Sequence, residues 1–136
     1  MKILEVQNLS KIYGKGENQI NALKNVSFVM EKGEFAAIVG ESGSGKSTLL
    51  NCVGGLDTPT AGRVFVDGED LFQLDERKRT IFRRRNIGFI FQEFHLIEEL
   101  NVEQNITFPL LLDGRKPEKE RGEEILEVLG LADRRK

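Results

Sequence analysis

Apolar and polar side chains alternate along several short stretches of the chain, which is the pattern of strands that bury one face. Residues 4–7 and 26–30 show this alternation, and we expect the first stretch to form an edge strand. Residues 64–66 are apolar and stand before the turn-forming pair Asp67-Gly68. They therefore predict a further short strand that ends in a turn.

Two other stretches are apolar without interruption, which is typical of parallel strands buried on both faces. They are residues 35–39 and residues 87–91. The first stretch is followed directly by the glycine-rich residues 40–45. We predict that residues 35–39 form the central strand of a parallel sheet and that residues 87–91 form a second buried strand.

Four stretches have the residue types of helices. Residues 46–53 predict a helix closed by Gly54-Gly55, and residues 75–85 predict a charged helix with a mostly solvated face. Asn101 and Gln104 have the side chains of a capping box, so a helix is expected to begin there and to be disturbed at Pro109. Residues 117–129 predict an amphipathic helix that ends before Gly130; its apolar face would comprise Ile125, Leu126, Val128 and Leu129.

Composition places the chain among ordinary globular proteins. Its 136 residues suit one domain, with 39% hydrophobic and 31% charged residues. A net charge of -2 argues against a global attraction to nucleic acid or to an anionic membrane. Cys52 is the single cysteine and lies among apolar residues, so we expect it to be buried and the protein to be cytosolic. No apolar run approaches the roughly 20 residues of a membrane helix, so membrane work is expected from another chain.

The glycine-rich segment carries the clearest chemistry. It has the complete pattern G-x-x-x-x-G-K-S, formed by Gly40, Glu41, Ser42, Gly43, Ser44, Gly45, Lys46, Ser47 and Thr48. Glycines between a strand and a helix let successive backbone N–H groups point at one anion. Lys46 would reach the β- and γ-phosphates, and the Ser47 hydroxyl would hold a magnesium ion.

An ordinary turn followed by a solvated lysine is the alternative interpretation of this segment. The full spacing, set between a predicted strand and a predicted helix, favours a nucleotide site. We therefore expect ATP and Mg²⁺ as cofactors.

The surrounding residues resemble the ATPase subunits of ABC transporters. Residues 9–14 are similar to the stretch in which that family places an aromatic residue against adenine, and Tyr13 is the match. Residues 22–28 resemble the family's next strand, whose start at Ala22 would lie near the ribose. The turn-rich residues 56–62, followed by Val64, also match. The resemblance implies an α/β fold: a P-loop NTPase core with a small antiparallel β subdomain, truncated before the signature and Walker B segments.

Residues 83–92 resemble the approach to the family's Q-loop. The resemblance implies that Gln92 offers its amide oxygen to magnesium or orients water, as a second catalytic and metal-binding residue beside Lys46 and Ser47. The segment after Gln92 would receive a membrane permease, with a surface formed by Phe91, Phe94, Leu96 and Ile97. An apolar core is the alternative for these side chains. Residues 94–110 resemble the subgroup that serves lipoprotein-release, macrolide-efflux and antimicrobial-peptide export permeases.

The resemblance has consequences for organisation and partners. It implies one partial ATPase domain, with residues 1–92 as nucleotide-binding core and β subdomain and residues 93–136 as the start of a helical subdomain. A second ATPase subunit would pair head to tail with this one. The protein would lie in the cytoplasm, peripheral on the inner face of the cell membrane through the permease.

Up to Lys136 the sequence has no counterpart of the family's Leu-Ser-Gly-Gly-Gln signature, Asp-Glu strand or switch histidine. His95 lies too close to Gln92 to be that histidine. We therefore expect this chain by itself to bind ATP without turnover, and we expect an exposed apolar face along residues 35–39.

Two other functions remain as alternatives. One is a nucleotide-binding fragment or interaction module that does not hydrolyse anything. The other is a DNA-acting P-loop ATPase whose basic patch would comprise Arg77, Lys78, Arg79, Arg83, Arg84 and Arg85. Charge runs on helices are more often solvated faces, and acidic residues lie nearby, so no nucleic-acid partner is expected.

Overall fold

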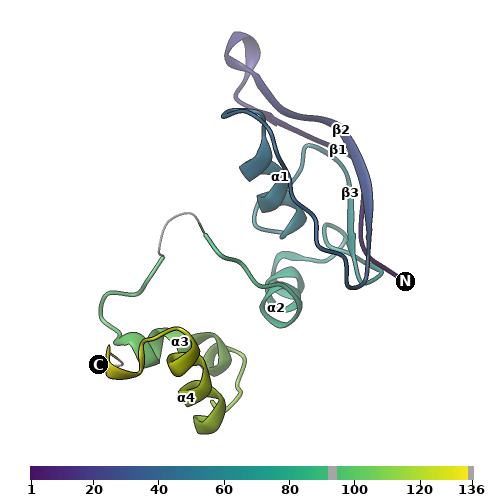
Figure 1. Cartoon of the computed structure of the whole chain (residues 1–136). Coiled ribbons are helices and arrows are strands. Elements are labelled where there is room, and N and C mark those ends of the chain that lie inside the picture. The colour runs from purple at the N-terminus through teal and green to yellow at the C-terminus, as the bar shows by residue number, and fades with distance from the viewer. Residues whose placement is uncertain (92–94, 135–136) are drawn as a thin grey trace. The chain divides into compact units, whose positions relative to one another are not determined.

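The computed structural model describes residues 1–91 and 95–134 (Figure 1). They form two compact units, Met1–Arg83 and Arg84–Lys136. Each unit has its own internal packing. The division near residue 92 into core and helical subdomain stays a prediction.

The first unit contains a four-stranded antiparallel sheet of order β2-β1-β3-β4. Its strands are β1 (Lys2–Tyr13), β2 (Ile20–Glu31), β3 (Ala61–Val66) and β4 (Glu69–Asp70). The predicted strands at residues 4–7, 26–30 and 64–66 are confirmed. The prediction that the first is an edge strand is wrong, because Val6 pairs with Phe28 on one side and with Val64 on the other. Alternation reports which face is buried and says nothing of the neighbours within the sheet.

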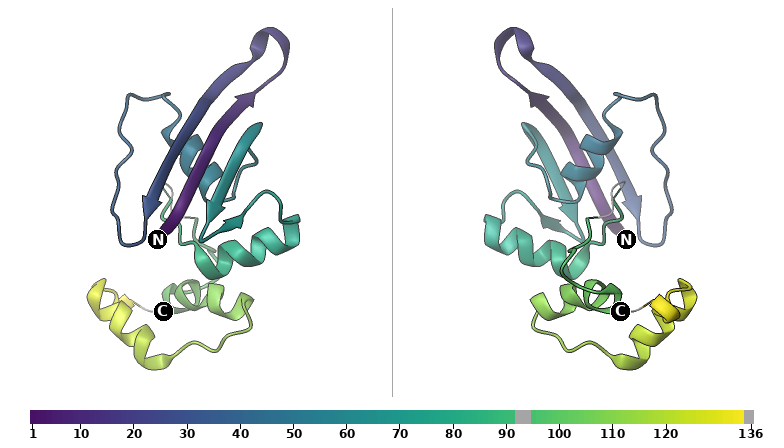
Figure 2. Two further views of the ribbon diagram at one scale, coloured as in Figure 1. Left: turned by 90° about the vertical axis from the view of Figure 1, so that its right-hand side faces the viewer. Right: turned by 90° about the vertical axis from the view of Figure 1, so that its left-hand side faces the viewer.

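One face of this sheet packs against helix α1 (Lys46–Val53), as both views of Figure 2 show. Val6, Leu9 and Val64 from the sheet and Leu49 and Cys52 from α1 are buried. The expected burial of Cys52 is confirmed. Burial raises the pKa of its thiol to about 11, so the sulfur is protonated and unreactive at neutral pH.

Residues 35–39 do not form the predicted central strand. They belong to an extended loop between β2 and α1 (Figure 2). The Phe35 side chain is 99% exposed. A continuous apolar run becomes a buried strand only where other strands pair with it, and the described residues place none beside this segment. The expected exposed apolar face along residues 35–39 is therefore observed. Residues 87–91 also lack the predicted strand, and Ile90 is fully exposed.

Helix α2 (Glu76–Asn86) follows the first unit's sheet and has no buried residue, in agreement with its predicted solvated face. Two short 3₁₀ turns, η1 (Gly16–Asn18) and η2 (Ala132–Arg134), complete the described elements. The second unit contains helices α3 (Val102–Leu112) and α4 (Lys119–Val128).

The capping box at the start of α3 is confirmed. Asn101 Oδ1 accepts from the Gln104 N–H at 2.8 Å, and Gln104 Oε1 accepts from the Asn101 N–H at 2.9 Å. The helix continues past Pro109 to Leu112, so the disturbance predicted at this proline does not end it. A proline in the last turn removes one N–H donor and leaves the bonds that follow it intact, since the Asp113 N–H still reaches the Pro109 carbonyl oxygen at 3.3 Å.

Helix α4 buries less of its apolar face than predicted. Leu126 is buried, whereas Val128 is 81% exposed and Leu129, just past the helix, is 61% exposed. The four apolar side chains point in a wider range of directions around the axis of α4 than a single neighbouring helix, α3, can cover. Gly130 follows with a φ of 70°, as expected for a glycine that ends a helix.

Candidate functional site

The predicted phosphate loop leads directly into the N-terminus of α1. Gly45 is the N-cap residue and provides no side-chain cap, and residues 40–44 are exposed. The Gly45 carbonyl accepts the first helical bond, from the Leu49 N–H at 2.9 Å. The N–H groups of the first turn therefore have no acceptor within the helix. They present the positive end of the helix dipole to solvent beside a loop of small residues.

Glycine is required where this loop meets the sheet. Gly45 has a φ of 95°, and a Cβ placed on it would lie 2.4 Å from the Ala22 carbonyl oxygen. Ala22 belongs to β2, so the loop and the start of the strand segment at residues 22–28 are in direct contact. The structure thus brings together Ala22 and the phosphate loop, which the sequence placed in separate motifs.

The Lys46 side chain crosses the loop. Its ammonium donates to the carbonyl oxygens of Gly40 and, at 3.1 Å, of Glu41. The Ser44 N–H also donates to the Glu41 carbonyl, at 3.1 Å, which closes a turn. Lys46 is the only basic residue among residues 40–48. Its ammonium therefore lies over the backbone whose N–H groups are expected to donate to phosphate.

Tyr13 lies at the end of β1 and is held by residues that the sequence analysis did not single out. Its hydroxyl donates to Asp57 Oδ2 at 2.6 Å, and the Lys11 ammonium lies 3.2 Å from Asp57 Oδ1. The same ammonium lies over the Tyr13 ring, 5.0 Å from its centroid. Asp57 belongs to the turn-rich stretch that matched the ABC family, and no periodicity in the sequence links it to Tyr13.

These contacts change the acidity of both partners. The hydrogen bond to Asp57, followed by burial, raises the pKa of Tyr13, while the Thr48 side chain acts in the opposite direction. The Tyr13 hydroxyl, with lesser help from Lys11, lowers the pKa of Asp57. The pair is therefore a neutral phenol and an ionised carboxylate at neutral pH, beside the first turn of α1.

The segment predicted to receive a permease is described only in part. Gln92 and Phe94 lie outside the described residues. Phe91 stacks on Phe89 at 5.3 Å between ring centroids and meets the His95 ring at 4.3 Å. Phe91, Leu96 and Ile97 are all exposed. His95 is also exposed.

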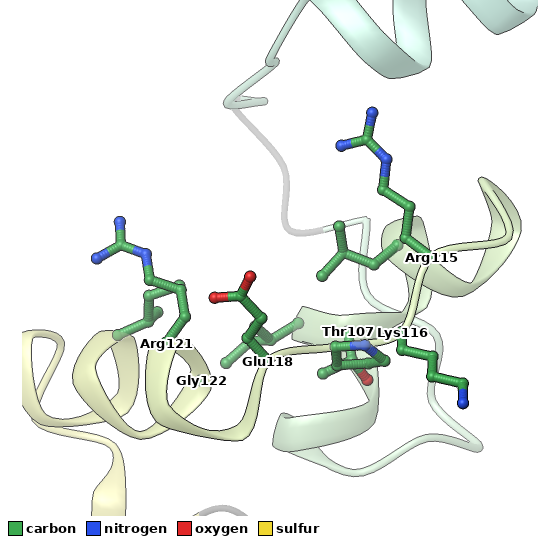
Figure 3. Close-up of a pocket in the computed structure, with 10 residues that line it drawn as sticks. Thr107, Arg115, Lys116, Glu118, Arg121 and Gly122 are labelled. Carbon is green, nitrogen blue, oxygen red and sulfur yellow. The ribbon is translucent and has the colours of Figure 1, made fainter.

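A pocket of about 320 Å³ opens between α3 and α4 in the second unit (Figure 3). Ile106, Leu110 and Ile125 provide apolar lining, and Arg115 and Arg121 lie at its edge. Both arginines are already paired, Arg115 with Asp113 and Arg121 with Glu124. The pocket contains none of the predicted site residues.

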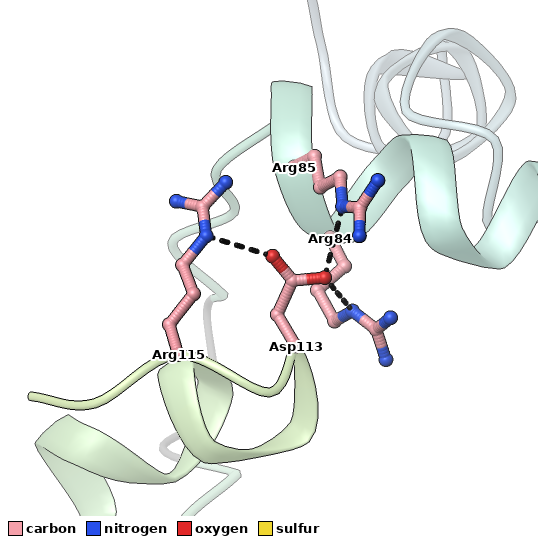
Figure 4. Close-up of polar contacts among 4 residues, drawn as sticks. All are labelled: Arg84, Arg85, Asp113 and Arg115. Carbon is pink, nitrogen blue, oxygen red and sulfur yellow. Dashed lines mark hydrogen bonds and ion pairs between the residues drawn. The ribbon is translucent and has the colours of Figure 1, made fainter.

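Asp113 is the charged centre of the second unit (Figure 4). Its Oδ1 lies 3.0 Å from the Nε of Arg84 and of Arg85, and its Oδ2 lies 3.0 Å from the Nε of Arg115. The hydrogen bond from Arg85 is the main cause that lowers the pKa of Asp113. Two members of the basic patch considered for DNA binding are thus engaged within the protein.

Replacing Asp113 by asparagine is expected to lower the urea midpoint of unfolding at pH 7, because three guanidinium groups lose their shared anion. Because the folded pKa lies below the value of about 3.9 for an unfolded aspartate, the ionised carboxylate stabilises the fold above about pH 4. That contribution disappears as the pH falls through the folded pKa. Circular dichroism at pH 7 and pH 3 checks this: the difference between wild type and variant should be smaller at pH 3. Asp133→Asn serves as the control, and a difference that does not depend on pH would contradict the expectation.

The described residues hold no group of three or more His, Cys, Asp or Glu side chains that would bind a metal ion by themselves. In the same part of the chain, no helix has the length and apolar character needed to cross a membrane.

Comparisons with known proteins place this geometry in context. Residues 23–136 match the family described as ABC transporter. The chain is 48% identical over 134 residues to the ABC transporter ATP-binding protein MJ1508 of Methanocaldococcus jannaschii, covering 97% of this chain and 60% of that protein. It is 42% identical over 134 residues to the lipoprotein-releasing system ATP-binding protein LolD of Pseudoalteromonas translucida, covering 97% of this chain and 58% of that protein.

A solved structure extends the similarity to three dimensions. It is a dimeric post-hydrolysis state of the ATP-binding cassette MJ0796 bound to ADP and Pi, with a TM-score of 0.83 and 43% identity. The alignment covers 96% of this chain and 57% of that one. The expected α/β cassette fold with an antiparallel sheet is thereby confirmed. The chain spans about 60% of the length of the relatives MJ1508 and LolD.

Proposed function

The chain belongs to the ABC transporter family, and from this premise we propose that it is the ATP-binding part of a transporter subunit. The observation that carries the proposal is the phosphate loop at residues 40–48, which ends at the uncapped N-terminus of α1. An uncapped helix N-terminus with exposed N–H groups is suited to an anion. The family supplies the identity of that anion as the polyphosphate tail of ATP.

The chain's own residues bind the tail in two ways. Backbone N–H groups of Gly43 and of Gly45 to Thr48 donate to phosphate oxygens, as the positive φ angles of Gly43 and Gly45 permit. Lys46 exchanges its carbonyl acceptors, Gly40 and Glu41, for oxygens of the β- and γ-phosphates. This exchange replaces neutral carbonyl acceptors with anionic phosphate oxygens, so that donor and acceptor both carry charge and the bonds are stronger.

The residues at the start of α1 also suit magnesium. Mg²⁺ keeps several waters and phosphate oxygens and needs few protein ligands, so one exposed hydroxyl, that of Ser47, fits its requirements. Gln92, outside the described residues, is proposed as a second ligand that also orients water. Magnesium bound with the nucleotide supplies neutralisation of phosphate charge.

The rest of the nucleotide extends toward the sheet. The contact of Gly45 with Ala22 supports a place for the ribose beside the start of β2, and Tyr13 lies beside Thr48 at the other end of the first helical turn. We propose that the Tyr13 ring stacks on adenine. Aromatic stacking of a base contributes free energy without selecting strongly among bases.

The transporter partners are part of the same proposal. The segment after Gln92 docks on a membrane permease, and a second copy of the subunit pairs head to tail, at the inner face of the cell membrane. The names of relatives support the pairing with a permease: one is a macrolide export ATP-binding/permease protein, MacB, of Mannheimia succiniciproducens, 41% identical over 138 residues, of which the alignment covers 22%. The exposure of Phe91, Leu96 and Ile97 is consistent with a surface that another chain covers.

Two alternative functions are a nucleotide-binding module that does not hydrolyse ATP and a DNA-acting ATPase. Residues 1–136 supply charge neutralisation through Lys46 and through the magnesium ion that Ser47 would hold, and we propose that they bind ATP without turnover, as a binding module would. A DNA-acting ATPase is disfavoured by internal contacts of the basic patch. Arg83 Nη1 donates to the Gly55 carbonyl at 2.7 Å, and Arg79 Nη2 donates to the Leu74 carbonyl at 3.2 Å.

Isothermal titration calorimetry with Mg-ATP and with AMP tests the proposal. AMP lacks the β- and γ-phosphates, so it forgoes charge-assisted bonds that contribute about 1.5–3 kcal/mol each. We expect AMP to bind at least about tenfold more weakly than Mg-ATP. Equal affinities, or the absence of heat with Mg-ATP, would contradict the assignment of residues 40–48 as a phosphate loop.

A further inference from the structure

The end of β1 carries a three-residue cluster that the phosphate loop does not explain. Lys11 and Tyr13 are two positions apart on one strand, so their side chains leave the same face of the sheet. Asp57 meets both: it accepts from the Tyr13 hydroxyl at 2.6 Å and pairs with the Lys11 ammonium at 3.2 Å. A distance of 2.6 Å is that of a charge-assisted O–H···O⁻ bond, which is about twice as strong as a neutral one.

The loop that carries Asp57 is itself held at both sides. The Asp57 N–H donates to the Asn51 carbonyl in the last turn of α1, at 3.2 Å. Lys11 also donates to the Thr58 carbonyl at 2.6 Å, and Thr60 accepts from the Ile12 N–H at 2.9 Å. The backbone of the loop that carries Asp57 is therefore tied to the last turn of α1 and to the end of β1, while the Asp57 carboxylate itself bonds to the two β1 side chains.

The ring of Tyr13 is fixed at two points. Its hydroxyl end is bonded to Asp57, and one of its faces lies under the Lys11 ammonium, 5.0 Å from the ring centroid. The Lys11 side chain is only 15% exposed, and Tyr13 is 39% exposed. A cation over one aromatic face leaves the opposite face for stacking.

We propose that Asp57 and Lys11 are positioning residues, which hold the Tyr13 ring so that one face is presented to the purine base of the bound nucleotide. The inference rests on the proposed nucleotide site and adds to it a reason for the orientation of the ring. Asp57 and Lys11 do not touch the nucleotide. They act through Tyr13, and their effect is confined to the base.

Three variants separate this role from a merely structural one. Asp57→Ala removes the anchor, Tyr13→Phe keeps the ring and removes its hydroxyl, and Asp57→Asn keeps an oxygen acceptor. Each is titrated with Mg-ATP and with magnesium tripolyphosphate, which offers the phosphates without a base. Glu69→Ala, on exposed β4, is the control.

We expect Asp57→Ala and Tyr13→Phe to weaken Mg-ATP binding by about five- to tenfold. This loss is smaller than that expected for removal of the aromatic ring, because both variants keep the ring. Asp57→Asn should retain most of the affinity, and tripolyphosphate should bind all four variants like the wild type. Unchanged Mg-ATP affinity in Asp57→Ala would overturn the inference, and so would a parallel loss for both ligands, which indicates damage to the fold. If the wild type binds neither ligand, the proposed function itself is wrong and the inference fails with it.

A spectroscopic measurement follows the same contact without any ligand. Tyr13 is the single tyrosine and the chain has no tryptophan, so ultraviolet titration of phenol ionisation reports this residue alone. We expect Tyr13 of the wild type to ionise above the ordinary pKa of about 10 and Asp57→Ala to bring it back toward that value. An identical titration in both proteins would overturn the anchoring of the ring by Asp57.

Discussion

Replacing Lys46 by alanine is expected to lower the affinity for Mg-ATP by at least about a hundredfold. The ammonium would make charge-assisted bonds to the β- and γ-phosphates, and two such bonds contribute about 1.5–3 kcal/mol each. The side chain reaches the loop backbone already, because it donates to the Gly40 and Glu41 carbonyl oxygens. Its loss therefore removes a cation that lies over the loop.

Calorimetric titration with Mg-ATP checks this expectation, with AMP as the second ligand. Because AMP has no β- or γ-phosphate, its affinity should change little in Lys46→Ala. Lys32→Ala is the matched control, since Lys32 is exposed in the turn after β2. Retention of Mg-ATP affinity within a factor of about three would show that Lys46 does not contact the phosphates, and a lowered urea midpoint would show that the substitution acts through the fold.

Replacing Gly45 by alanine is expected both to destabilise the first unit and to abolish measurable nucleotide binding. The backbone has a φ of 95°, which costs an L-residue about 1–2 kcal/mol. The new Cβ would lie 2.4 Å from the Ala22 carbonyl oxygen and 3.3 Å from Leu23 Cδ2. Relief of such overpacking costs about 1–3 kcal/mol more and moves the loop away from β2. Because the N–H groups of the loop act together, the displaced loop no longer surrounds the phosphates.

Gly43 provides a control within the same loop. It has a φ of 82°, and nothing lies within 4 Å of a Cβ placed on it. Gly43→Ala should therefore show only the backbone strain of about 1–2 kcal/mol. Urea unfolding followed by Tyr13 fluorescence measures both variants. Equal midpoints would mean that the contact between Gly45 and Ala22 does not matter to stability.

The strands of the first unit show which features of a sheet a local sequence pattern can predict. Alternation predicted β1, β2 and β3, because the face that a strand buries is set by its own residues. The place of β1 between β2 and β3 depends on pairs such as Val6 with Val64, which are far apart in the chain. The apolar residues 35–39 were misread for the same reason, since a strand also requires neighbours.

The same distinction between neighbouring residues and remote contacts applies to the candidate site. The phosphate loop could be proposed from the sequence, because its glycines, lysine and hydroxyl are neighbours in the chain and their spacing encodes the chemistry. Tyr13 was predicted from resemblance alone. Its partner Asp57 was missed, since the two residues are 44 positions apart and meet only when the loop after α1 closes on the end of β1.

The amino-acid sequence by itself determined the helices and the strands of the antiparallel sheet, and it suggested the chemistry proposed for residues 40–48, because propensity, capping and glycine placement act over a few neighbouring residues. Only the tertiary structure decided that Gly45 meets Ala22, that Lys11 and Asp57 both contact Tyr13, and that Asp113 pairs with three arginines. Those contacts join segments that are remote in the chain, and their geometry is set by how the sheet and helices pack.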